Sequence, residues 1–158
     1  MQVTCTDYYD KAHLVDSKDI IDTTRAYGVC IIDQKVLLIQ DTYSRRWELP
    51  GGGVEKNETA HQGLIREFIE ETGAVPKGDL IFLAEWVELF FDTVSDEAWR
   101  AKRKFYLVES IQGKLLEHGN NNDSAAARFV HLDELLGLPM TDRIRQVIHL
   151  ASVTPLKN

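Results

Sequence analysis

The segment from Gly52 to Ala74 constrains this chain most, because it joins a glycine turn to a helix with three glutamates on one face. Glu70 and Glu71 follow Glu67 by three and four residues. Residues at this spacing are neighbours on a helix, and like charges there destabilise it by about 0.2–0.5 kcal/mol per pair. Hard divalent cations such as Mg²⁺ bind oxygen ligands, usually a few carboxylates together with substrate phosphates. This helix face therefore suits a metal–phosphate site.

The residues around the three glutamates support the same interpretation. Pro50 and the run 51–53 predict a tight turn with a close backbone approach, leading to a helix that begins near Glu58. Gly73 is placed to end that helix. Arg66 lies eight residues after Glu58 and can pair with it. A merely solvated charged face is the alternative, but such a face requires neither the preceding glycines nor the arginine.

The segment resembles the Nudix box, whose pattern is Gly, five residues, Glu, seven residues, then Arg-Glu-hydrophobic-any-Glu-Glu-any-Gly-hydrophobic. Its nine specified positions are filled by Gly52, Glu58, Arg66, Glu67, Phe68, Glu70, Glu71, Gly73 and Ala74. A match of this length is far more specific than a short glycine motif. The last position departs slightly from the family, which usually places a larger aliphatic residue there.

The resemblance implies an α+β fold, a Nudix-like αβα sandwich with a mixed β-sheet between helices. The alternation of predicted strands and helices without strict βαβ order agrees with this fold class. Residues 25–158 would form the Nudix hydrolase domain. Residues 1–24 would be an N-terminal extension, either an added strand or a dimer contact.

The resemblance also implies hydrolysis of a pyrophosphate bond in a nucleoside diphosphate linked to another moiety. Nucleotide sugars, ADP-ribose, dinucleoside polyphosphates, nucleoside triphosphates and capped RNA all suit the same box. The acidic balance of the chain makes long RNA the least attractive of them. The implied cofactor is Mg²⁺ or Mn²⁺, which neutralises the charge of the pyrophosphate and lowers the pKa of a bound water. The family roles assign the metal ligands to Glu67, Glu70, Glu71 and the carbonyl of Gly52. Arg66 and Glu58 would orient the helix face.

The general base is predicted to be Glu70, since family members use either a box glutamate or an acid on a distant loop. Acids outside the box remain alternatives, although each alone is also typical of a solvated surface. These alternatives are Glu85, Glu88, Asp96, Glu117 and Asp123.

Substrate recognition is weakly encoded in the sequence. The candidates for phosphate contacts are Arg25, Arg45 and Arg46. The candidates for stacking on a base are Trp47, Trp86, Phe90 and Trp99. Each of these residues is equally compatible with an ordinary surface arginine or a core aromatic residue.

Composition indicates one globular domain of 158 residues, with 44% hydrophobic and 27% charged residues. A net charge of −7 argues against a nucleic-acid or membrane surface, where a basic stripe is expected. The first ten residues lack the features of a secretory signal, and two cysteines indicate no disulfide framework. We expect a cytoplasmic protein with a nucleotide-type small-molecule substrate and no membrane or nucleic-acid partner. Homodimerisation remains open.

Two other functions are compatible with the same fold. The first is a catalytically silent Nudix-fold nucleotide sensor or partner-binding domain, although a binder need not keep all three carboxylates. The second is an isoprenoid diphosphate isomerase, for which Cys30 is the candidate nucleophile. Its neighbours are apolar, which does not activate a thiolate.

The hydrophobic pattern places secondary structure before the box helix. Residues 27–32 and 36–39 predict the strands of a hairpin around a turn at 33–34. Residues 41–46 predict a polar loop, and 47–50 the end of a strand that leads into the glycines.

After the box helix, residues 80–91 and 104–108 predict strands, with 92–102 as an exposed connection between them. A further strand over 128–132 precedes a short helix from Asp133. The last helix has Thr141 as its N-cap. Its core-facing stripe is Ile144, Val147, Ile148 and Ala151.

Overall fold

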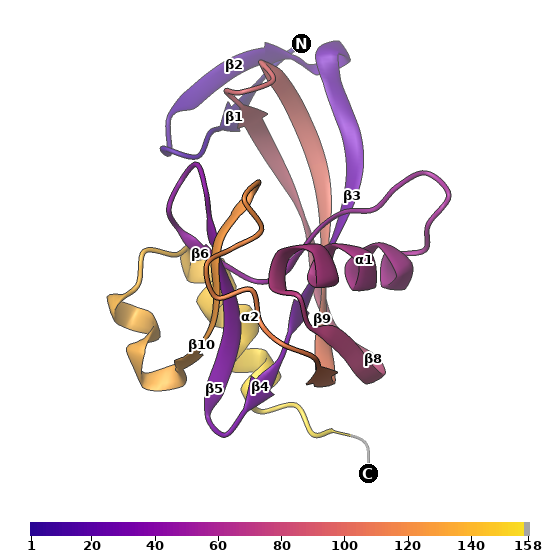
Figure 1. Ribbon diagram of the computed structural model, residues 1–158. Coiled ribbons are helices and arrows are strands. Elements are labelled where there is room, and N and C mark those ends of the chain that lie inside the picture. Colours follow the sequence, from indigo (N-terminus) through magenta and orange to yellow (C-terminus); the bar gives the residue numbers. More distant parts are fainter. Residues whose placement is uncertain (157–158) are drawn as a thin grey trace.

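A mixed six-stranded sheet is the largest element of the fold, which the computed structural model describes for residues 1–156 (Figure 1). Its strands, in spatial order, are β2 (Ala12–Asp16), β1 (Gln2–Thr6), β8 (Val75–Asp92), β9 (Glu97–Gln112), β3 (Ile20–Val29) and β7 (Gly51–Gly53). The pairs β1–β8 and β3–β9 are parallel and the other pairs are antiparallel. The sheet is therefore mixed, as predicted.

A smaller antiparallel sheet lies beside it. Its strands are β10 (Ser124–His131), β5 (Lys35–Asp41) and β4 (Ile31–Ile32), with β6 (Trp47–Glu48) also paired to β5. The turn between β4 and β5 has Asp33 and Gln34 at φ 50° and 62°. Two left-handed residues in succession fit the twist of a two-residue hairpin. The predicted hairpin is confirmed.

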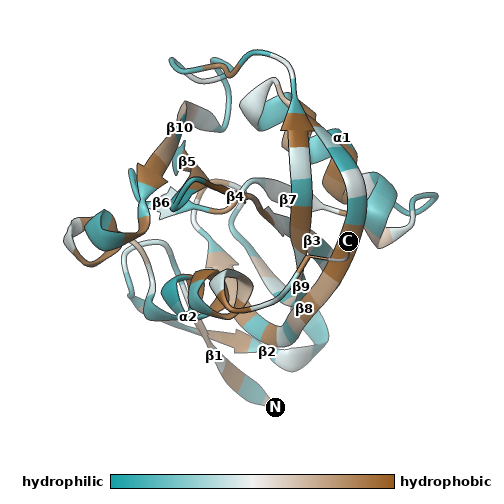
Figure 2. Ribbon diagram, turned by 90° about the horizontal axis from the view of Figure 1, so that it is seen from below, coloured by the Kyte–Doolittle hydropathy of each residue, from teal (hydrophilic) through white to brown (hydrophobic). Residues whose placement is uncertain are grey.

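Two helices cover opposite faces of the strands (Figure 2). Helix α1 (Ala60–Thr72) buries Leu64 and Phe68 in one core. The same core contains the strand residues Ala26, Leu37, Tyr106 and Val108, and Cys30 between β3 and β4. Helix α2 (Asp142–Ser152) packs in a second core, whose strand residues are Tyr27, Val29, Val36, Leu38, Phe105 and Leu107. Since successive strand residues point to opposite faces, the two cores lie on opposite sides, and the α+β sandwich is confirmed.

The first 24 residues are structured. They form β1, β2, the 3₁₀ turn η1 (Ser17–Asp19) and the first half of β3. The hairpin of β1 and β2 joins the large sheet through a short parallel contact, in which Thr6 pairs with Phe90. The expected boundary between residues 24 and 25 falls inside β3, so one strand connects the N-terminal segment to the rest of the fold.

The predicted exposed connection over residues 92–102 is wrong. Strand β9 begins at Glu97, so only residues 93–96 lie between β8 and β9. Over residues 97–102 the buried positions of β9 are filled by Ala98 and Ala101, which raise the local hydropathy little. Arg100 extends outward and pairs with Asp22 at 3.1 Å. Small buried residues beside long charged ones explain why this strand has the composition of a loop.

Other boundaries move by a few residues. Strands β8 and β10 begin earlier than predicted, at Val75 and Ser124. Helix α1 begins at Ala60 because Thr59 and Gln62 form a reciprocal capping box. The short helix expected from Asp133 is a 3₁₀ element, η2 (Leu132–Gly137).

The last helix agrees with the prediction. Thr141 is its N-cap, and the stripe of Ile144, Val147, Ile148 and Ala151 is buried. Among the helices within residues 1–156, none combines the length and the apolar character required to cross a membrane.

Replacing Leu64 by alanine should lower the free energy of unfolding by about 2–5 kcal/mol, because the side chain is fully buried beneath α1. The matched control is Leu136→Ala in η2, where the side chain is 87% exposed and the expected change is within about 0.5 kcal/mol. Urea unfolding followed by circular dichroism measures both. Equal losses in the two variants would contradict the assigned core.

Candidate active site

Strand β7 and helix α1 approach each other closely because β7 consists of glycines. A Cβ atom on Gly51 would lie 2.1 Å from the carbonyl oxygen of Ala26. One on Gly52 would lie 2.8 Å from the carboxyl carbon of Glu67. Gly51 also has φ +144°, which side chains rarely tolerate. The glycines therefore bring the backbone of β7 against the carboxylates of α1.

Three carboxylates converge at this point. Glu67, Glu71 and Asp123 each offer an oxygen, and these atoms lie within 4.8 Å of one another. Glu71 is only 6% exposed, and its Oε2 accepts a hydrogen bond of 2.8 Å from the backbone N–H of Gly51. Burial raises the pKa of Glu71 well above its usual value and raises the pKa of Glu67 as well. A divalent cation would relieve the repulsion among these groups.

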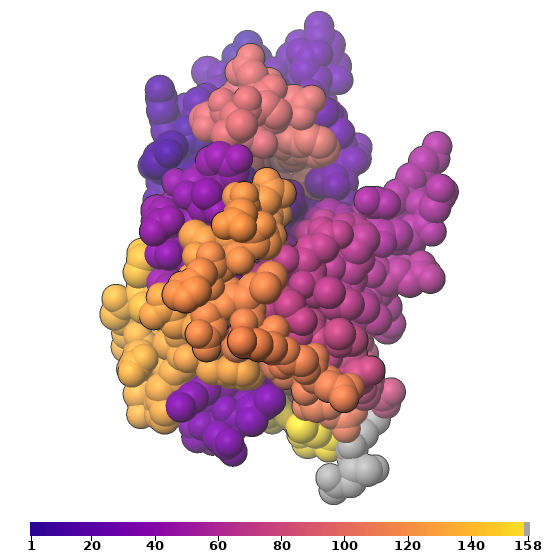
Figure 3. Space-filling model, viewed as in Figure 1, coloured from indigo at the N-terminus to yellow at the C-terminus, as the bar shows by residue number. Residues whose placement is uncertain are grey.

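Asp123 reaches this cluster from the loop before β10, which packs against α1 (Figure 3). The side-chain amide of Asn120 donates to Asp123 Oδ1 at 2.8 Å and to the carbonyl oxygen of Glu70 at 3.2 Å. The hydroxyl of Ser124 donates to the carbonyl oxygen of Glu71 at 3.3 Å. These bonds tie the loop to the C-terminal turn of α1. The sequence predicts Asp123 only as an alternative base, because no spacing links it to α1.

Glu70 lies outside this group of three. Its side chain is 55% exposed, and its Oε1 is 3.6 Å from Nη1 of Arg66. The structure thus brings together two of the three glutamates on the helix face, Glu67 and Glu71, and adds Asp123.

Arg66 connects the turn before α1 to the carboxylate cluster. Its Nε and Nη2 donate to the two oxygens of Glu58 at 2.9 and 2.8 Å. Its Nη2 also donates to the Gly53 carbonyl at 2.9 Å, and Nη1 donates to Glu67 at 3.0 Å. The hydrogen bonds from Arg66 lower the pKa of Glu58 to about 2. The predicted pairing of Arg66 with Glu58 is present, and it fixes the orientation of Glu67.

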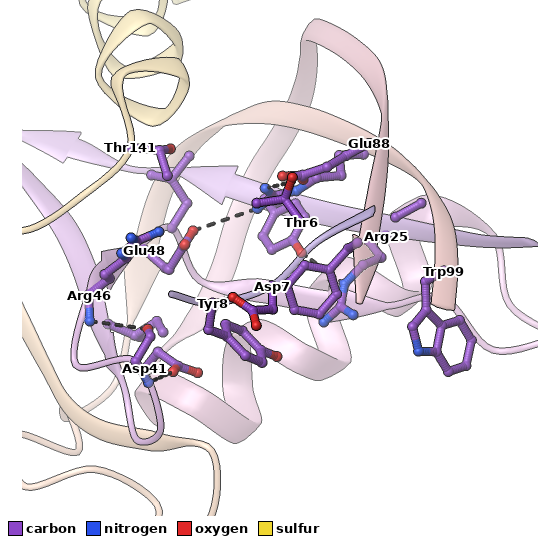
Figure 4. Close-up of a pocket in the computed structure, with 18 of the residues that line it drawn as sticks. Thr6, Asp7, Tyr8, Arg25, Asp41, Arg46, Glu48, Glu88, Trp99 and Thr141 are labelled. Carbon is purple, nitrogen blue, oxygen red and sulfur yellow. Dashed lines mark hydrogen bonds and ion pairs between the residues drawn. The ribbon is translucent and has the colours of Figure 1, made fainter. Parts of the chain in front are cut away.

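A cavity of about 200 Å³ lies beside the cluster, with Glu71 and Gly51 in its lining (Figure 4). Of the predicted phosphate contacts, Arg25 and Arg46 line this cavity, whereas Arg45 does not. Arg45 lies in the turn after β5 with φ 60°.

Two of the four aromatic candidates line the same cavity, namely Phe90 and Trp99. Trp47 is 6% exposed in the core beneath α2, with the guanidinium of Arg128 4.6 Å from its ring centroid. Trp86 is stacked on Phe105 at 4.3 Å.

The alternative base residues are scattered. Glu85 lies 3.9 Å from the ammonium of Lys104, and Glu88 accepts from Arg103 at 2.9 Å in the cavity wall. Asp96 belongs to the turn between β8 and β9, and Glu117 is exposed in the loop before β10. Of the five acids, Asp123 alone joins the box carboxylates in the cluster.

Replacing Glu58 by glutamine should lower stability in a pH-dependent way. The pKa of Glu58 is about 2 in the folded chain and near 4.5 when unfolded, so its stabilisation is complete above pH 4.5 and is lost as the pH falls through about 2. The stability difference between wild type and Glu58→Gln should therefore be constant from pH 7 to 5 and shrink towards pH 2.

Urea unfolding at several pH values measures this difference. Glu55→Gln is the control, since its 69% exposed side chain lies 4.0 Å from Arg66 and should contribute little. A Glu58→Gln effect that is independent of pH would show that the ion pair does not stabilise the turn.

The family of the chain follows from comparison with known proteins. A family model described as NUDIX domain matches residues 22–151. The RNA pyrophosphohydrolase of Helicobacter pylori (strain P12) is 31% identical over 101 residues, which cover 57% of this chain and 61% of that protein. Putative nudix hydrolase 1 of Caenorhabditis elegans is 31% identical over 121 residues, or 75% of this chain and 30% of that protein. The chain thus spans less than two thirds of the length of these relatives.

Solved structures show the same fold. A MutT NUDIX hydrolase from Burkholderia pseudomallei superposes with a TM-score of 0.66 at 24% identity, covering 85% of this chain and 99% of that chain. A MutT protein from Bacillus halodurans gives a TM-score of 0.66 at 22% identity, covering 80% of each chain. With the family model matching residues 22–151 and a complete box on α1, this chain belongs to the Nudix family.

Proposed function

We propose that the chain is a divalent-metal-dependent hydrolase that cleaves the pyrophosphate bond of a nucleoside diphosphate linked to another moiety. The substrate is a nucleotide sugar, ADP-ribose, a dinucleoside polyphosphate or a nucleoside triphosphate. The convergence of Glu67, Glu71 and Asp123 beside a cavity lined by arginines is the observation that carries this proposal. Relatives named RNA pyrophosphohydrolase support cleavage of a phosphoanhydride.

The donor set fits Mg²⁺ or Mn²⁺, because both prefer carboxylate and carbonyl oxygens. Glu67, Glu71 and Asp123 would hold the cation, with the Gly52 carbonyl as a further ligand. A bound divalent cation neutralises the pyrophosphate charge and lowers the pKa of its bound water.

The residues of the chain have separate tasks around this site. The N–H of Gly51 holds the carboxylate of Glu71, and Arg66 holds that of Glu67. Arg25 and Arg46, in the cavity lining, bind phosphate oxygens. Glu70 lies on the same helix with a half-exposed carboxylate, and as general base it takes the proton of the attacking water.

We place the enzyme in the cytoplasm, with a nucleotide-type small molecule as its substrate and without a nucleic-acid partner. Residues 1–24 would also provide the contact of a homodimer, in addition to the strands that they add to the sheet.

Product release from a panel of the four substrate classes, with Mg²⁺ or Mn²⁺ and with chelator, tests the activity. An RNA oligonucleotide with a 5′ triphosphate is added to these four classes, because curated relatives are named RNA pyrophosphohydrolases. We expect metal-dependent cleavage of at least one class, and Glu70→Gln should lower its kcat about 100-fold or more with folding intact. A near-normal rate would refute the role of Glu70. Binding without turnover across the panel would instead favour a nucleotide sensor.

Asp123→Asn tests the cluster independently of turnover. Replacing one of three converging carboxylates should weaken Mn²⁺ binding about tenfold or more, measured by isothermal titration calorimetry at pH 7.5. Glu117→Gln, in the same loop but outside the cluster, is the matched control and should bind Mn²⁺ as the wild type does. Unchanged affinity in Asp123→Asn would remove this residue from the site.

A further inference from the structure

The turn between β1 and β2 forms one wall of the cavity, although it precedes the family match at residues 22–151. Thr6, Asp7, Tyr8 and Asp10 all contribute to the cavity lining. In Figure 4 the side chains of Tyr8, Arg25 and Glu48 lie around the same space. A segment outside the family domain therefore shapes the site that the domain supplies.

This turn is held in one conformation by a buried carboxylate. Asp7 is 5% exposed, and its Oδ1 accepts from the backbone N–H groups of Tyr9 at 2.8 Å and Lys11 at 3.0 Å. Its Oδ2 lies 2.7 Å from Nε2 of His13. The ring of His13 is in turn stacked on Phe91 of β8, with centroids 4.2 Å apart. Such a network presents the intervening residues rigidly.

The turn is attached to both sides of the cavity. At its start, Thr6 pairs with Phe90 of β8. Near its end, Asp10 forms an ion pair of 2.7 Å with Arg46, in the loop between β5 and β6. Phe90 and Arg46 also line the cavity, so the turn connects two of its walls.

Tyr8 supplies an aromatic surface to this space. Its ring meets Phe90 edge-on, with centroids 4.6 Å apart and planes at 70°. An edge-on contact leaves a ring face for another partner. Tyr27, Phe90 and Trp99 are the other aromatic side chains of the lining. A planar heterocycle is the ligand that such walls accommodate best.

Glu48 and Arg103 add charged side chains to the aromatic lining of the cavity. Oε2 of Glu48 and Nε of Arg103 are buried without a hydrogen-bond partner within residues 1–156. Nη2 of Arg103 lies 3.6 Å from Glu48 Oε2, which is too far for a hydrogen bond. Both atoms are buried, so a ligand in the cavity would meet the exposed part of the Glu48 side chain, which is 26% of its surface, and not these two atoms. The edge of a nucleobase presents N–H groups beside acceptors.

We propose that this cavity binds the nucleobase of the substrate, and that Tyr8 of the N-terminal turn is a specificity-determining residue that stacks on it. The partly exposed carboxylate of Glu48 then meets the edge of the base. The inference rests on the proposed function, since it assigns the base to the cavity beside the carboxylate cluster. Tyr8 contacts the base and leaves the phosphate chemistry to the cluster.

Ligand binding without turnover tests this assignment. Isothermal titration calorimetry compares the four common nucleoside 5′-monophosphates with ribose 5-phosphate, which lacks a base, in buffer with Mg²⁺. The variants are Tyr8→Leu, which keeps apolar bulk but removes the flat ring, and Tyr8→Phe, which keeps the ring. Tyr9→Leu is the matched control, because Tyr9 is 70% exposed and lies outside the lining. Thermal unfolding verifies that each variant is folded.

Base–aromatic stacking predicts that Tyr8→Leu weakens binding of at least one nucleotide by about 5- to 100-fold. Its affinity for ribose 5-phosphate should not change, and Tyr8→Phe and Tyr9→Leu should resemble the wild type. An equal loss for ribose 5-phosphate, unchanged nucleotide affinity in Tyr8→Leu, or no nucleotide binding by the wild type would each overturn the inference. If Tyr8→Leu fails to fold, the comparison between Tyr8→Phe and wild type decides, since loss of base-dependent affinity in Tyr8→Phe would overturn stacking.

Failure of the two proposals is distinguishable. A wild type that binds nucleotides through Tyr8 but cleaves none of the substrate panel would overturn the hydrolase proposal and leave the base site standing. A wild type that cleaves nucleotides with the same KM and base preference as Tyr8→Leu would overturn the base site alone.

Discussion

The close approach of α1 to β7 is the constraint on which the site depends. Without a side chain at Gly52, the carboxylate of Glu67 can lie against the strand. The N–H of Gly51 binds Glu71, and the carbonyl of Gly53 binds Arg66. A helix and a strand are thus joined through backbone groups, and the carboxylates are held where the backbone directs them. Like-charged carboxylates stay close together because the fold holds them there against their mutual repulsion.

The rest of the fold positions this contact. The capping box at Thr59 and Gln62 sets the start of α1, and Leu64 and Phe68 seat the helix on the strands. Gly73 ends it in the left-handed conformation at φ 78°, from which the chain enters β8. Each of these features has a local physical cause. The end of the box helix at Gly73 and the buried stripe of α2 were therefore predictable from sequence, whereas the start of the helix moved from Glu58 to Ala60.

Long-range pairing was not predictable in the same way. Nothing in the sequence of β1 indicates that it lies parallel to β8. The pairing joins Thr6 to Phe90, which are far apart in the sequence, and it is short. The segment 97–102 has the composition of a loop but completes a strand between two neighbours. This segment is a strand because it pairs with β8 and β3 on its two sides, and not because of its local hydropathy.

In the candidate site too, local contacts were predictable from sequence and long-range contacts were not. Arg66 and Glu58 pair as their spacing suggested, since both belong to one local segment. Asp123 joins the cluster only because Asn120 and Ser124 bind the end of α1. Tyr8 enters the cavity only because the N-terminal hairpin folds against β8. Local sequence therefore indicated the chemistry of the site, whereas tertiary hydrogen bonds determine which residues complete it.

Anomalous diffraction from crystals grown with Mn²⁺ would test the central claim most directly. A manganese ion bound by oxygens of Glu67, Glu71 and Asp123 is the predicted result. A manganese ion bound through Glu70 and remote from Asp123, or no ion along α1, would contradict the assignment of this carboxylate cluster as the metal site.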